Sequence, residues 1–184
     1  DMQDWDQHAL PPEPAPAVSL LPEPLSWDDI DHGPKDIDFV FPGLPLGSVG
    51  MIAAPGSTGK SFLLLSLAVS VATGTSIFPG WALNHAQANK PAKVLMFFGE
   101  DPPDILHNRL YALLQSPWVQ ASSRRAALIK ENLEVRSLVG RPTALTERNR
   151  AREWMRSDIA KEISEYMLEH TPRLVCIDPL RQFH

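Results

Sequence analysis

The sequence has very little cysteine. Its 184 residues include one, Cys176, which lies in an apolar run. A disulfide framework is therefore excluded, and a single thiol fits a reducing compartment, so we expect a cytoplasmic protein. Long apolar runs are also absent, since residues 62–72 are interrupted by serine and fall short of the roughly 20 residues that span a bilayer. The first residues are acidic, unlike the basic start of a secretory signal. We expect no membrane contact.

Net positive charge is absent as well. The formal charge of −5 gives no strong overall attraction to nucleic acid, although it leaves room for local basic loops. Proline, by contrast, is abundant at 18 residues and is dense in residues 1–25, which show no apolar periodicity. This segment is predicted to be a polyproline-II-prone tail, either a disordered leader or a docking motif. Residues 26–184 are predicted to form the N-terminal part of one globular domain.

Strand and helix patterns alternate along that domain. Apolar runs predict strands over residues 47–53, 93–100 and 173–178, and residues 133–139, LEVRSLV, are expected to form a further strand. Helical spacing and helix-ending residues predict helices over residues 60–73, 103–115, 122–132 and 147–169. The alternation indicates an α/β fold with a parallel sheet flanked by helices. In such sheets, ligands bind beyond the carboxyl ends of the strands.

Residues 54–61, APGSTGKS, follow the first of these strands and open the first helix. They match the phosphate-loop pattern G-x-x-x-x-G-K-[ST], except that Ala54 replaces the first glycine. Gly56 and Gly59 would let backbone N–H groups converge on a phosphate, and the helix N-terminus adds further donors. The alternative is an ordinary glycine-rich turn. The residues expected to bind ATP are Pro55, Gly56, Ser57, Thr58, Gly59, Lys60, Ser61 and Phe62.

Two carboxylates end the later apolar strands. Asp178 is placed as a Mg²⁺-site residue would be, with Ser61 as the second metal ligand, although a strand-terminal Asp can also be a turn or cap residue. Pro179 follows Asp178, so no neighbouring glutamate can activate water there. Glu100 is therefore the candidate water-activating group, with Lys60 as the second catalytic residue. Asp101 is the runner-up, but Asp101 before two prolines favours a helix cap.

These segments carry a specific resemblance. The loop PGSTGKS, the strand end FFGEDPP followed by HNRL, and the segment LVCIDPLRQFH together resemble the RecA-fold ATPases of the plasmid replicative helicase RepA type. The resemblance covers residues 36–184. It implies a RecA-like P-loop NTPase, a DNA helicase that works as a hexameric ring and couples ATP hydrolysis, with Mg²⁺, to movement on single-stranded DNA. Arg109 matches a family arginine, either a structural ion pair or a catalytic group.

The resemblance also implies parts that this sequence lacks. The family's arginine finger, sensor strand and DNA-binding loops all follow the Asp178 strand, so we expect an N-terminal fragment that hydrolyses ATP poorly alone and contacts DNA through other segments. Without the next strand, the strands over 47–53 and 173–178 would lack the neighbour that joins them. Two alternatives stay open. One is a RecA- or KaiC-like ATPase in recombination, repair or signalling, and the other is a truncated nucleotide-binding regulator.

Overall fold

The computed structural model describes residues 22–78 and 90–183. Two compact units make up the chain, and the boundary between them lies between Asp36 and Ile37. In the first unit, helix α1 (Trp27–Asp31) begins at Ser26, whose side chain accepts a hydrogen bond from the Asp29 backbone N–H. The predicted proline-rich tail lies outside the described residues as far as residue 21, and a domain start at residue 26 stays a prediction.

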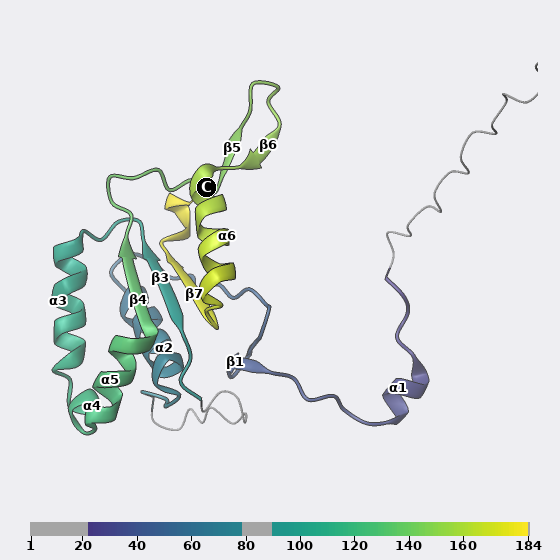
Figure 1. The fold of residues 1–184 in the computed structure, drawn as a ribbon, viewed down its shortest axis with the longest axis horizontal. Coiled ribbons are helices and arrows are strands. Elements are labelled where there is room, and N and C mark those ends of the chain that lie inside the picture. Colours follow the sequence, from purple (N-terminus) through teal and green to yellow (C-terminus); the bar gives the residue numbers. More distant parts are fainter. Residues whose placement is uncertain (1–21, 79–89, 184) are drawn as a thin grey trace, which may run out of the picture. The chain divides into compact units, whose positions relative to one another are not determined.

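A three-stranded parallel sheet organises the second unit (Figure 1). Strand β3 (Val94–Phe98) is central and pairs with β4 (Leu133–Ser137) on one side and β7 (Leu174–Asp178) on the other. All five residues of β3 are buried. The strand predicted from the continuous apolar run over residues 93–100 is therefore confirmed in β3, because a strand covered on both faces has no polar side. The strands predicted over residues 133–139 and 173–178 form as β4 and β7, and the α/β fold with a parallel sheet is confirmed.

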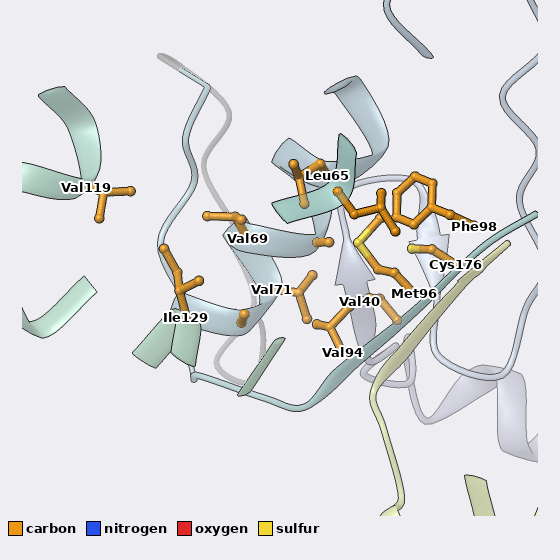
Figure 2. Packing of buried hydrophobic residues seen from close by; sticks show 13 residues of the cluster. Val40, Leu65, Val69, Val71, Val94, Met96, Phe98, Val119, Ile129 and Cys176 are labelled. Atoms are coloured by element: carbon orange, nitrogen blue, oxygen red, sulfur yellow. The ribbon is translucent and has the colours of Figure 1, made fainter. Parts of the chain in front are cut away.

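Helices cover the two faces of this sheet. On one face lie α2 (Lys60–Thr73), α3 (Pro103–Leu114), α4 (Pro117–Gln120) and α5 (Ser123–Asn132), whose buried apolar side chains form one cluster with Val94, Met96 and Phe98 (Figure 2). On the other face, α6 (Asp158–His170) packs on Leu95 and Phe97. Successive β3 side chains thus alternate between two apolar clusters, as the pleat of a strand requires. No helix in the described parts of the chain is long and apolar enough to cross a bilayer.

Helix α2 matches its predicted bounds and supports the first cluster. Its second half is fully enclosed, and Ala68, Val69 and Ala72 have no exposed surface. Gly74 ends the helix with a left-handed backbone and donates its N–H to the carbonyls of Ser70 and Val71. Cys176 lies in the same cluster, and burial raises the pKa of its thiol to about 12, so it is a core residue and not a reactive one.

The strand predicted over residues 47–53 does not form. The chain there has no regular structure, and Val49 and Met51 are 97% and 77% exposed. Only a short antiparallel pair precedes it, β1 (Phe39–Phe41) with β2 (Leu44–Pro45). Among the described residues, no strand pairs with the outer edge of β7. A strand needs a neighbour to satisfy its backbone groups, and the part of the chain that the structure describes provides none for this apolar segment.

The helix predicted over residues 147–169 is wrong in its first half. Residues there form an antiparallel hairpin, β5 (Thr146–Arg148) with β6 (Trp154–Arg156), and α6 begins only at Asp158. Two local features explain the difference. Arg152 adopts a left-handed backbone, which a helix does not tolerate, and the Ser157 side chain caps α6 by accepting from the Ala160 N–H. Trp154 therefore lies on the hairpin and not on the α6 face.

Replacing the cap residue Ser157 tests whether α6 begins at Asp158, because the two possible helix boundaries predict changes of opposite sign in the free energy of unfolding. Ser157 also donates from Oγ to the Ala144 carbonyl, at 2.5 Å. We expect Ser157→Ala to lower the free energy of unfolding by about 1–2 kcal/mol, because a helix N–H and a partly buried carbonyl lose their partner. Urea denaturation measures the change. Ser164→Ala, inside α6, is the control. If residues 147–169 were one helix, Ser157→Ala would instead stabilise the protein by about 0.5 kcal/mol.

Candidate functional site

The glycine-rich loop joins the irregular segment to the first turn of α2. Its positive φ angles fall on Ser57 (60°) and Gly59 (85°). Ala54 has no positive φ, so its methyl group fits without strain. Gly59 is the N-cap of α2, and no described side chain caps that end. The first backbone N–H groups of α2 are therefore left for an anion, with the positive end of the helix dipole behind them.

Lys60 folds back over this loop. Its Nζ donates to the carbonyl oxygens of Ala54 at 2.8 Å and Pro55 at 2.7 Å. Thr58 adds a bond from Oγ1 to the same Pro55 carbonyl, at 2.8 Å. These contacts hold the loop in a closed curve around the ammonium group. A phosphate is a stronger acceptor for an ammonium than a carbonyl oxygen, so the same Lys60 can turn to a bound anion.

Ser61 and Asp178 meet at the carboxyl edge of the sheet. The Ser61 hydroxyl, in the first turn of α2, donates to Asp178 Oδ2 at 2.5 Å, although 117 residues separate the two in the chain. Both oxygens are hard donors of the kind that Mg²⁺ takes, and Mg²⁺ completes its shell with waters and phosphate oxygens. The predicted pair of metal ligands is thus brought together. Nowhere in the described residues do three or more His, Cys, Asp or Glu gather into a group that could hold a metal ion.

Glu100 follows β3 at the same edge, and its Oε1 atom is held by the turn η1 (Leu180–Gln182) that follows β7. Arg181 donates to this oxygen from Nε at 2.9 Å and also from Nη2, and Gln182 donates from Nε2 at 3.1 Å. These bonds, the Arg181 one foremost, lower the pKa of Glu100 below its ordinary value, against an opposing effect of desolvation. Glu100 is therefore ionised at neutral pH.

The prediction that Asp101 caps the next helix is wrong. Pro102 is the N-cap of α3, and the Asp101 carboxylate instead forms an ion pair with Arg109. The Asp101 carbonyl accepts from the Ser137 hydroxyl at 2.7 Å. The Arg109 guanidinium also lies 5.6 Å from the ring centroid of Phe62, which joins α3 to the loop end of α2. Of the two roles left open for Arg109, the contacts present here are those of a structural ion pair.

Sequence reasoning missed Gly99, Arg181 and Gln182 as site residues. The Gly99 N–H donates to the Asp178 carbonyl at 2.9 Å, which joins the ends of β3 and β7. A Cβ atom on Gly99 would lie 2.9 Å from Gln182 Cβ and 3.2 Å from the Phe183 ring. Only glycine lets the η1 turn pack this close to Glu100. The sequence signal that could have identified Arg181 and Gln182 is the segment IDPLRQFH. This segment supports the resemblance to the RepA-type ATPases, but the resemblance assigns no role to its arginine or glutamine.

Removing the arginine tests the contact. We expect Arg181→Ala to raise the pKa of Glu100 toward its ordinary value, because the largest cause of its lowering is lost. A lowered carboxyl pKa favours the folded state above the ordinary pKa, and this contribution is lost as pH falls through the folded-state value. A carboxyl-carbon NMR titration measures the shift. Arg124→Ala, an exposed arginine on α5, is the control, and an unchanged Glu100 titration in Arg181→Ala would contradict the contact.

One comparison with known families bears on this arrangement. A sequence model described as an AAA domain matches residues 14–184, which is most of the chain and includes the loop, Glu100 and Asp178. The match agrees with the observed parallel sheet, its flanking helices and the phosphate-type loop at its edge. The chain therefore belongs to the AAA domain family, and its fold is that of an α/β, RecA-like P-loop ATPase domain.

Proposed function

We propose that this chain is the nucleotide-binding part of a motor that hydrolyses ATP and acts on single-stranded DNA as a helicase or translocase. The observation that carries the proposal is the contact between Ser61 and Asp178. It places a hydroxyl and a carboxylate together beside a helix N-terminus whose N–H groups have no side-chain cap. A phosphate and a divalent cation are the partners that such a pair of sites would take together.

ATP and Mg²⁺ fit the residues present. The phosphates would lie against the backbone of residues 55–62 and receive the Lys60 ammonium. Ser61 and Asp178 would hold the cation, which when bound neutralises charge on the phosphates. This arrangement accounts for two hard oxygen donors and a cluster of backbone N–H groups at one sheet edge. It leaves the nucleobase preference open, because these residues predict contacts to the phosphates and the cation but none to the nucleobase.

Glu100 is the group that would orient the attacking water. It is ionised, as an acceptor of a water proton must be, and only its Oε1 atom is engaged by Arg181 and Gln182. Pro179, directly after Asp178, offers no such acceptor. Water activation from a neighbouring strand end, and not from the residue after the metal-site Asp, is thus the mechanism that the chain supports best.

The helicase assignment extends this chemistry to a partner. It rests on the resemblance of residues 36–184 to the RepA-type helicases, which also suggests a hexameric ring. Within that proposal, ATP hydrolysis at the loop would drive movement along the single strand, and neighbouring subunits would complete each site.

Two substitutions separate binding from turnover. We expect Lys60→Ala to weaken binding of a fluorescent ATP analogue by about tenfold to a hundredfold, because a charged hydrogen-bond donor is lost. Glu100→Gln keeps the shape but not the charge. It is expected to leave binding within about twofold and to lower phosphate release by roughly 10²–10⁴-fold.

Matched controls carry the same chemical changes elsewhere, Lys130→Ala and Glu131→Gln on α5. The same variants are compared, in the whole protein, for strand displacement on a forked DNA. Unchanged phosphate release in Glu100→Gln would remove Glu100 from the mechanism. ATP turnover without any strand displacement or movement on DNA would contradict the motor assignment but not the ATPase.

A further inference from the structure

We propose that the β5–β6 hairpin, residues 146–156, is a binding site for single-stranded nucleic acid. The inference deepens the proposed function, because it rests on the proposed action on single-stranded DNA and assigns a contact to this chain itself. The hairpin extends beyond the carboxyl ends of the sheet strands, at the end of the sheet where Glu100 and Asp178 lie (Figure 1).

Positive charge is concentrated on this hairpin. Its four arginines and two glutamates give a net charge of +2, whereas the whole chain carries −5. All four arginine side chains are exposed, and none forms an ion pair with a described carboxylate; they are Arg148, Arg150, Arg152 and Arg156. Of the seven arginines elsewhere in the described residues, four bind a carboxylate, namely Arg109, Arg136, Arg173 and Arg181, whereas on the hairpin none does. Unpaired cations on a protruding element suit a polyanionic partner.

An aromatic surface accompanies the charge. Trp154 is 65% exposed, although tryptophan is usually well buried. The Arg148 guanidinium lies 4.5 Å from its ring centroid, in a cation–π contact that holds the ring against β5. A tryptophan beside unpaired arginines can stack on an unpaired base while the arginines bind the flanking phosphates. This pairing favours a single strand over a duplex, whose base faces are already stacked, and over an acidic protein surface, which has no bases.

The hairpin is ordered by its own hydrogen bonds. At the tip, Asn149 and Glu153 exchange backbone and side-chain bonds, including Glu153 N–H to Asn149 Oδ1 at 3.0 Å. At the base, Leu145 donates its N–H to the Phe183 carbonyl at 2.9 Å and accepts from the Ser157 N–H at 3.0 Å. Phe183 is 1% exposed, so this anchor is fixed in the core. A platform held in this way loses little conformational freedom on binding.

The test measures binding of a fluorescein-labelled 20-nucleotide oligothymidylate by anisotropy, as a function of salt. We expect Arg150→Ala/Arg156→Ala to weaken binding about tenfold and to reduce the slope of log K against log salt by about 1.4, for two lost phosphate contacts. Arg124→Ala/Lys130→Ala on α5 removes the same charge and should stay within about twofold. Trp154→Ala should weaken binding about tenfold with the slope unchanged, and Trp154→Phe should keep most of the affinity.

Several results would overturn the proposal. One is an equal loss of oligothymidylate affinity in the two double variants, or no loss of affinity in any hairpin variant. Another is that the protein binds a duplex of equal length as tightly as the single strand. A third is that the hairpin variants lose self-association in sedimentation while they still bind oligothymidylate. The proposed ATPase activity is tested separately from the proposed hairpin contact. Lys60→Ala leaves the hairpin untouched and should bind the oligonucleotide normally, and unchanged turnover in Glu100→Gln would remove the catalytic assignment while a hairpin-dependent oligonucleotide contact remained.

Discussion

The parallel pairing of β3 with β7 is the constraint on which the candidate site depends. Its register sets Phe98 opposite Asp178, and the Gly99 N–H extends the ladder to the Asp178 carbonyl. Both carboxylates, Glu100 and Asp178, therefore leave the sheet at one edge. The pairing is held by β3 side chains that are buried on both faces, each worth about 1.5–3 kcal/mol relative to exposure. Because α2 packs on the same sheet, its first turn brings Ser61 to Asp178.

The close packing at Gly99 adds a second consequence. The η1 turn leaves β7 directly after Asp178 and returns over Gly99, so Arg181 and Gln182 reach Glu100. One short segment thus joins the residue proposed to hold the cation and the residue proposed to orient water. Its last residue, Phe183, packs into the α6 face of the sheet and also accepts the hydrogen bond that anchors the β5–β6 hairpin. Three features of the site therefore depend on the placement of residues 178–183.

The sequence predicts the elements whose signals are local. Continuous apolar runs identified β3 and β7, and a further apolar run identified α2 with its bounds. The prediction of a strand over residues 47–53 was wrong because a strand depends on a neighbouring strand, and the sequence of the segment itself carries no information about that neighbour. The hairpin was missed because the helical spacing of Ile159, Ile163 and Tyr166 was extended back to Trp154. Trp154 lies five residues before Ile159 and so does not share their face, and the Ser157 cap separates it from the helix. In the site, motif spacing anticipated the meeting of Ser61 and Asp178, whereas the contacts of Gly99, Arg181 and Gln182 arise only from tertiary packing.

The central claim is that Ser61 and Asp178 together hold the cation of a bound nucleotide. The most direct measurement is the affinity of a fluorescent ATP analogue with Mg²⁺ and with EDTA, for the wild type and for Asp178→Asn. The account predicts that Mg²⁺ tightens binding to the wild type, and that Asp178→Asn loses about tenfold of this gain, because a carboxylate ligand becomes a neutral amide. The affinity in EDTA should change little. An equal gain from Mg²⁺ in both proteins, or none in the wild type, would contradict it.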